Sequence, residues 1–398
     1  MLPFGDPMIS HSVRCSLFFA PTLAVSIAGA QTVPTRTLTK PEVEVRESFS
    51  WLEEGVREMR DGRVIVIVGI DDVIKIVDLA ANTAATFSRK GDGPGEYRFP
   101  NQLFALPGDS TAMLESSWRR MLVILPNGKP GGFLSPRPSI ANRTEGAQEI
   151  HAQRTDGRGR FYGSGAIYRM NGAVLQQYDS IAILRWALNG SRIDTVGYVA
   201  QPPNNVKASS RGNNHMISIG GGGGPFGPRD AWDVAPDGRV VVVSASTYSI
   251  TWTDPNTGKR TTTAPIPHVK YPVTDAHKKQ WMDQQRTGGG GVACGDNACS
   301  KVPMTRRPVQ EPANWGGEFL PVFRAGESLS FDPDGMLWVK RSGPVGAPLT
   351  YDVIDRAGKL AQHVVFPEHV RLIGFGANGA IYAARTDDDD LQYLQRYR

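Results

Sequence analysis

The chain has 398 residues, of which 40% are hydrophobic and 21% charged, and its formal net charge is +5. This mild charge comes without a stripe of lysines and arginines, which argues against a nucleic-acid-binding protein. Forty-four glycines and 29 prolines are typical of many short strands joined by tight turns, and a chain of this length can form one large β domain.

The first thirty residues have the pattern of a signal peptide. Arg14 supplies the positive flank, residues 17–27 form a short apolar core, and residues 28–30 (Ala-Gly-Ala) make a small-x-small cleavage site. The apolar core is too short for a stable membrane anchor, and Cys15 lacks the small residues of a lipoprotein signal. We therefore predict a periplasmic or secreted protein whose mature domain spans residues 31–398.

Six short turns recur along the mature chain, each followed by an apolar run. Gly, Asn and Asp tolerate the positive φ angles that a two-residue hairpin loop requires. A hairpin signal that recurs about every 45 residues is typical of the blades of a β-propeller. The turns are Asp61-Gly62, Gly108-Asp109, Asp156-Gly157, Asp237-Gly238, Asp334-Gly335 and Asn378-Gly379.

Five of the six repeats have a second turn, after another alternating strand. The sixth repeat lacks one, because the chain ends after residues 391–397. Residues 42–47 alternate between polar and apolar side chains, as an edge strand does, and precede the first turn. We predict that they pair beside residues 391–397, which removes an exposed sheet edge. The predicted fold is an all-β, six-bladed β-propeller closed by an N-terminal strand; the alternative is a two-domain β protein.

Two intervals between repeats are long. Residues 199–228 are polar and Gly-rich, and residues 265–323 form the largest insertion, with one helical stretch at 275–286. Loops of this length in a compact domain are usually functional or disordered.

The insertion contains the only two cysteines of the mature chain, Cys294 and Cys299. In an oxidising compartment two nearby cysteines usually form a disulfide, which we predict here. A zinc site would need two more ligands, and only His268 and His277 lie nearby at irregular spacing. A redox-active role is less favoured, because Cys294 and Cys299 lack the strand-to-helix setting of the Cys-x-x-Cys oxidoreductases.

Residues 90–100 (Lys-Gly-Asp-Gly-Pro-Gly-Glu-Tyr-Arg-Phe-Pro) resemble the Gly-x-Gly-Pro-Gly-Glu-Phe signature of bacterial extracytoplasmic six-bladed propellers related to NHL-repeat proteins. Tyr97 stands where Phe is usual. Residues 228–238 and 332–339 agree with that family. The resemblance covers the chain from about Glu42 onward and implies the fold and export, but little about activity. A phosphate-binding loop at residues 90–100 would need a following helix and a Lys-Ser/Thr pair, and the sequence has neither.

Four arginines stand where the chain leads into the inner strands of four blades. Converging guanidinium groups would form a pocket for a carboxylate or phosphate at the channel mouth. We expect at least three to point toward one face, beside the insertion. Alternatively, each pairs with a local carboxylate (Glu96, Asp230, Glu327 or Glu368) and ties blades together. The candidate ligand-binding residues are Arg98, Arg229, Asp230, Arg324 and Arg371.

A second set of residues is acidic or amide-bearing: Asn101, Glu149, Asp230 and Glu327. These oxygen ligands could hold Ca²⁺ on the axis, as in propeller lactonases of the gluconolactonase type, although no local metal motif supports it. Nucleophilic catalysis has little support, because the chain has no Gly-x-Ser-x-Gly motif and its histidines are scattered.

The sequence favours a monomeric binding or interaction module without a cofactor, whose partner is a small anionic ligand or an envelope protein. The alternative is a channel-mouth hydrolase or lyase, lactonase-like and possibly dependent on Ca²⁺. Carboxylates with asparagines at the axis would favour the enzyme, and an arginine-lined or apolar mouth would favour binding.

Overall fold

The computed structural model describes residues 33–116, 120–137, 150–165, 168–171, 174–188, 192–202, 205–211, 214–220, 223–287, 291–294, 299–302, 309–324 and 329–398. The predicted signal peptide lies outside these ranges. None of the helices within them is long and apolar enough to cross a membrane.

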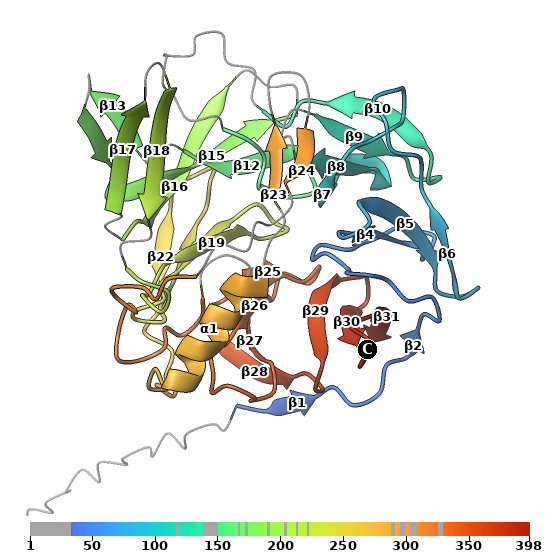
Figure 1. Ribbon diagram of the computed structural model, residues 1–398. Helices are drawn as coiled ribbons and strands as arrows, with labels where there is room; N and C mark the ends of the chain where they lie inside the picture. The colour runs from blue at the N-terminus through green and yellow to red at the C-terminus, as the bar shows by residue number, and fades with distance from the viewer. Residues whose placement is uncertain are drawn as a thin grey trace, which may run out of the picture. The chain divides into compact units, whose positions relative to one another are not determined.

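Six sheets, each built mainly of antiparallel strands, are arranged around one axis within residues 33–398 (Figure 1). This arrangement confirms the six-bladed propeller. Blade 1 contains β3 (Arg57–Glu58), β4 (Val64–Val68), β5 (Val73–Asp78) and β6 (Thr83–Thr86). Blade 2 contains β7 (Pro100–Ala105), β8 (Thr111–Glu115), β9 (Met121–Ile124) and β10 (Pro130–Leu134), with the short 3-10 helix η1 (Pro107–Asp109) between its first two strands.

The remaining blades have the same plan. Blade 3 contains β11 (Arg154–Thr155), β12 (Arg160–Ser164), β15 (Ser180–Ala187) and β16 (Ile193–Ala200). Blade 4 contains β19 (Ala231–Val234), β20 (Val240–Val243), β21 (Ile250–Thr253) and β22 (Arg260–Thr262). Blade 5 contains β25 (Leu329–Phe331), β26 (Leu337–Lys340), β27 (Thr350–Ile354) and β28 (Leu360–Val365). Blade 6 contains β29 (Val370–Phe375), β30 (Ile381–Thr386), β31 (Gln392–Tyr397) and β2 (Val43–Glu44).

The apolar runs after the turns become strands that are buried on both faces. Every residue of β4 is buried. Val64, Val66 and Val68 pack in a cluster with blade 6, whereas Ile65 and Ile67 pack in a cluster with blade 2. Such a strand needs apolar residues at successive positions, because successive side chains point to opposite faces.

The ring closes as the sequence predicts. Val43 and Glu44 of β2 lie opposite Arg396 and Gln395 of β31, and the Val45 amide donates to the Leu394 carbonyl at 2.9 Å. Val45 is fully buried. The N-terminal strand therefore supplies the outer strand that blade 6 lacks.

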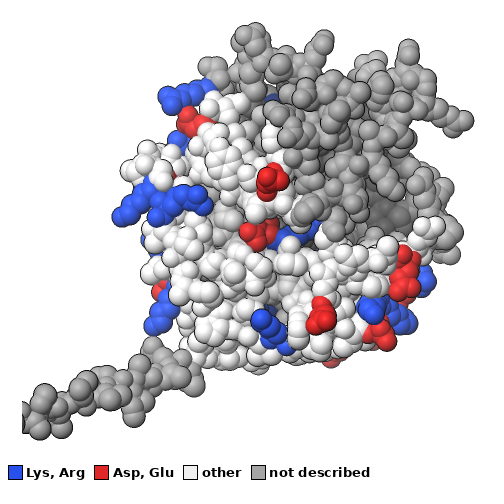
Figure 2. Space-filling view, turned by 90° about the vertical axis from the view of Figure 1, so that its left-hand side faces the viewer, with Lys and Arg blue, Asp and Glu red and all other residues white. Residues whose placement is uncertain are grey.

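Several strands were not predicted. β1 (Thr35–Thr37) adds a parallel fifth strand beside β28. β13 (Tyr168–Asn171) and β14 (Val174–Gln177) form a separate hairpin between β12 and β15 in the chain. β17 (Asn205–Arg211) and β18 (Asn214–Gly220) form another hairpin within the long polar interval. Figure 2 shows charged side chains of both signs scattered over the described residues on the left-hand side of Figure 1.

The insertion contains the predicted helix, α1 (Asp275–Thr287), and an unpredicted hairpin of β23 (Gly291–Cys294) and β24 (Cys299–Val302). His277 fixes the start of α1, because its Nδ1 accepts from the Thr274 amide at 3.1 Å. Its Nε2 lies 3.2 Å from the Gly343 carbonyl, which joins the helix to the segment between β26 and β27.

Cys294 and Cys299 are directly opposite each other in the β23–β24 pair. Facing residues in an antiparallel pair have Cα atoms roughly 4.5–5.5 Å apart, which is a separation that a disulfide can span. Their side chains lie outside what the structure describes, so the disulfide stays a prediction.

Candidate functional site

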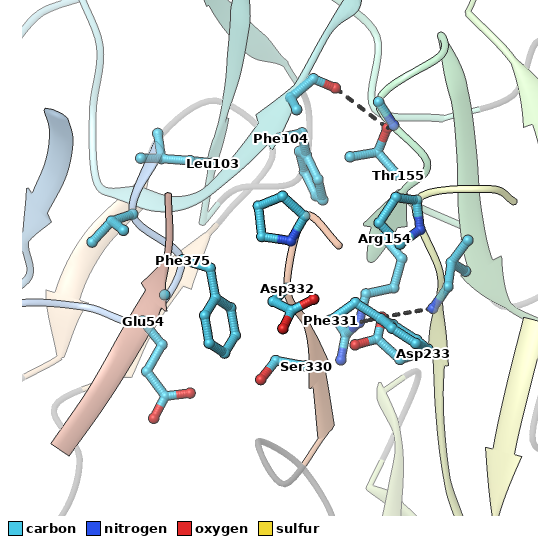
Figure 3. Close-up of a pocket in the computed structure, with 18 of the residues that line it drawn as sticks. Glu54, Leu103, Phe104, Arg154, Thr155, Asp233, Ser330, Phe331, Asp332 and Phe375 are labelled. Carbon is cyan, nitrogen blue, oxygen red and sulfur yellow. Dashed lines mark hydrogen bonds and ion pairs between the residues drawn. The ribbon is translucent and has the colours of Figure 1, made fainter. Parts of the chain in front are cut away.

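A cavity of about 410 Å³ lies on the propeller axis. All six blades contribute to its wall, mostly through the later residues of their innermost strands. Figure 3 shows side chains from several of these strands pointing into one space. The wall includes one residue from, or directly before, the innermost strand of each blade: in chain order Val56, Phe104, Thr155, Val234, Phe331 and Phe375.

Three phenylalanine rings belong to the apolar part of the wall, together with aliphatic residues such as Leu103 and Leu372. Phe104 packs edge-on against Phe161 with ring centroids 5.9 Å apart, and Phe375 lies 4.9 Å from the ring of Trp338. Phe331 packs on Trp252 at 5.8 Å. Because a second layer of aromatic rings holds each phenylalanine, the wall is fixed before any ligand arrives.

An ion pair joins two blades in this wall. Arg154, at the start of β11, donates through Nε to Asp233 of β19 at 2.9 Å. The Asp233 carboxylate also accepts from the Val234 amide at 2.7 Å. Burial raises the pKa of Asp233 above its ordinary value, and the Arg154 charge opposes that shift.

The other lining carboxyl groups outnumber the cations. Asp332 accepts from the Met336 amide at 2.9 Å and from the Trp338 indole at 3.0 Å, and burial raises its pKa. Asp156 pairs at 2.7 Å with Arg160, which does not itself line the cavity. Glu54 lies on the side of the cavity opposite Asp233 in Figure 3. Four carboxyl groups (Glu54, Asp156, Asp233, Asp332) and one arginine, Arg154, thus line the cavity, and Arg160 pairs with Asp156 from just outside the wall.

None of the four predicted arginines lines this cavity. Arg98 is exposed and pairs with Asp92 at 2.7 Å. Arg371 donates to the Leu52 carbonyl and stacks on the Trp51 ring at 4.2 Å. Arg324 is exposed and lies over the Phe226 ring at 5.7 Å, and Arg229 is half-buried. Their convergence on one face stays a prediction.

Three of the four local carboxylates lie among the described residues and have recorded partners, whereas Glu327 lies outside these residues. Glu96 accepts from the Gly93 amide and pairs with Arg89, and Glu368 pairs with His369 at 3.5 Å. The Asp230 carboxylate accepts from the Ala245 amide at 3.0 Å. Arg371 reaches a backbone carbonyl of residue 52, ahead of blade 1, and the alternative of inter-blade ties stays a prediction.

The structure describes only two of the four residues that were predicted as calcium ligands. Asn101 is exposed on β7, and Asp230 is half-buried. Glu149 and Glu327 lie outside the described residues. Within the described ranges, no three His, Cys, Asp or Glu side chains group closely enough to hold a metal ion. Calcium therefore stays a prediction.

Sequence reasoning missed Glu54, Arg154, Asp233 and Asp332. One signal was available: Asp233 interrupts the apolar run Ala231–Val234. A buried carboxylate requires a partner, so a charged residue inside a short inner strand indicates a contact with another blade.

Comparisons with known proteins find only distant structural similarity. No known protein family and no curated protein matches the chain. Among solved structures, it is similar to a streptogramin B lyase, with 14% identity, TM-score 0.36 and coverage of 89% of this chain and 85% of that one. It is also similar to a gluconolactonase of Xanthomonas campestris, with 11% identity, TM-score 0.39 and coverage of 93% of this chain and 99% of that one. A third similar structure is the calcium-binding protein regucalcin of Agrobacterium tumefaciens, with 10% identity, TM-score 0.37 and coverage of 91% of this chain and 95% of that one. At these identities the comparison carries no inference about ligand or activity.

Proposed function

We propose that the protein is a binding module whose axial cavity takes a small organic ammonium compound. The observation that carries this proposal is the lining itself, in which three phenylalanine rings accompany four carboxyl groups and one arginine. Export, the monomeric state and an envelope partner stay predictions from the sequence.

The chemistry of the wall favours a cation with an apolar surface. Aromatic faces attract an ammonium group within about 6 Å of the ring centroid, most strongly where water is excluded. Two of the lining carboxyl groups, Asp156 and Asp233, are paired with arginines. The other two, Glu54 and Asp332, add a negative potential inside a low-dielectric wall. The ligand proposed here therefore has the opposite charge to the one that the four arginines predict.

Choline is a suitable probe, with dimethylbutanol, in which carbon replaces the quaternary nitrogen, as its neutral isostere. We expect calorimetric titration to show choline binding and much weaker binding of dimethylbutanol. Phe375→Ala and Glu54→Gln should each weaken choline binding about tenfold, from loss of a cation–π contact or a charge.

Matched controls lie on the surface. Phe319 is 50% exposed and the Glu368 side chain 89% exposed, so Phe319→Ala and Glu368→Gln should leave choline binding unchanged. Failure of the wild-type protein to bind choline, or equal affinity for dimethylbutanol, would contradict the proposal.

A second candidate function is acid–base catalysis, as in a lactonase-like hydrolase. Asp233 and Asp332 both line the cavity, and burial raises the pKa of each, which is common for catalytic acids. A pH-stat assay with simple lactones tests it. Asp332→Asn should abolish turnover, whereas Asp334→Asn, an exposed neighbour in the same turn, should not. Equal turnover by both variants would exclude this role.

A further inference from the structure

A second cavity, of about 520 Å³, lies between the beginning of the insertion and blade 5. We call it the insertion cavity. Its wall combines residues 267–271 with the segment between β26 and β27 and with side chains of β27 and β28. It shares no lining residue with the axial cavity.

A buried carboxylate organises this cavity. Asp352 of β27 is fully buried and accepts three hydrogen bonds: from the Tyr248 hydroxyl at 2.5 Å, Arg341 Nη1 at 2.6 Å and His363 Nδ1 at 2.7 Å. The guanidinium charge of Arg341 balances the carboxylate, which a buried anion requires. Asp352 therefore acts as the acceptor in all three contacts.

This network fixes the tautomer of His363. Its Nδ1 carries the proton that it donates to Asp352, and in the neutral imidazole Nε2 then carries a lone pair. The His363 side chain keeps 31% of its surface exposed and lines the insertion cavity. Among the described residues, no hydrogen-bond partner of Nε2 is recorded.

A second imidazole has the same arrangement. His268 Nδ1 lies 3.1 Å from the Ile266 carbonyl, to which it can only donate, and its ring packs edge-on against Tyr248 at 5.6 Å. In the neutral ring its Nε2 is then also an acceptor. The Ser342 hydroxyl, also in the wall, is buried without a partner in the described part of the chain.

The rest of the wall determines what these acceptors can bind. It is largely apolar, with Pro267, Tyr271, Pro344, Leu349 and Val365. We propose that the insertion cavity is a second ligand site that takes a small phenol, whose ring packs on this wall and whose hydroxyl donates to His363 Nε2.

The probe is p-nitrophenol, because its phenol and phenolate forms absorb differently. Titration of the protein, followed by difference absorbance near neutral pH, should show one saturable site. In His363→Asn the amide nitrogen replaces Nδ1 as donor to Asp352, but the acceptor at Nε2 is lost. This variant should bind about tenfold more weakly, the loss expected for one hydrogen bond.

Two further variants make the test specific. His369, with a side chain 68% exposed, provides the matched control, and His369→Asn should bind p-nitrophenol like the wild type. Phe375→Ala, which alters the axial cavity, should also leave binding unchanged. Thermal unfolding of each variant checks that it is folded.

Three results would overturn the proposal: no saturable binding by the wild type, undiminished binding by a folded His363→Asn protein, or loss of binding in Phe375→Ala. The last would place p-nitrophenol in the axial cavity. Because choline binding depends on different residues, either proposal can fail while the other holds.

Discussion

Replacing Arg154 by methionine tests whether the Arg154–Asp233 pair stabilises the inner strands. The Asp233 side chain is 9% exposed and that of Arg154 is 31% exposed. Removing one partner of a buried pair leaves the other charge without compensation, which costs about 3–5 kcal/mol. Because Arg154 retains some contact with water, we expect the lower end, about 3 kcal/mol, or roughly 5 °C in melting temperature for a domain of this size.

The stability that Arg154→Met loses should depend on pH. Burial already holds the pKa of Asp233 above its ordinary value in the folded protein, and Arg154 opposes the shift. For a raised carboxyl pKa, the stability that the group contributes is complete below its unfolded pKa and falls as pH rises through the folded pKa. Without Arg154 the pKa of Asp233 rises further, so this fall extends to higher pH. The variant should lose more stability at about pH 8 than at about pH 5.

Calorimetric melting at the two pH values measures the effect. The double variant Arg154→Met with Asp233→Asn removes both charges and should recover most of the loss at the higher pH. Arg158→Met, at an exposed arginine of the following turn, should change stability by less than about 0.5 kcal/mol. A loss that is equal at both pH values, or a double variant as unstable as the single one, would refute the reasoning.

Three further predictions concern the ring and its insertion. Phe49→Ala should destabilise the protein by about 3–4 kcal/mol because Phe49 is buried beside the closing strand, whereas Ile70→Ala, 63% exposed, should have little effect on urea unfolding. Thiol titration of the unfolded, unreduced mature protein should find no free cysteine; two reactive thiols would show that the β23–β24 hairpin carries no disulfide. Arg371→Ala should lower the melting temperature, because its guanidinium donates to the Leu52 carbonyl across the ring closure. Arg98→Ala, which breaks only a surface pair, should leave it within experimental error.

The fold could be predicted because its signals are local. At Asp237-Gly238, Gly238 has φ +88°, and the Asp237 carboxylate accepts from the Arg239 amide at 3.0 Å. Such a turn depends only on neighbouring residues. The β17–β18 hairpin was missed because Asn205–Arg211 is polar and lacks a clear apolar alternation.

The axial site could not be predicted in the same way, because its residues meet only when the ring closes. Arg154 and Asp233 are 79 residues apart in the chain. The predicted arginines stand where the chain enters the inner strands, but the cavity is lined mainly by later residues of these strands. Arg229 precedes Asp233 by four residues, up to about 13 Å of extended chain. A distance of that size separates a predicted ligand-binding residue at the start of an inner strand from a cavity that lies near the end of the strand.

Arg154 also links the stability of the ring to the charge of the axial cavity, so its replacement should change choline binding in a pH-dependent way. Where Asp233 stays ionised, Arg154→Met removes a positive charge from the wall and choline should bind severalfold more tightly. Where Asp233 becomes protonated instead, the pair changes from one neutral state to another and the affinity should stay close to that of the wild type. The ratio of the choline affinity of Arg154→Met to that of the wild type should therefore rise with pH. Both affinities can be measured by titration at temperatures well below the melting transition. The same double variant serves as the control, since it has neither charge and should bind with little dependence on pH from this pair. A ratio that is independent of pH, or weaker choline binding by Arg154→Met throughout, would show that the cavity's carboxyl groups do not set its preference for a cation.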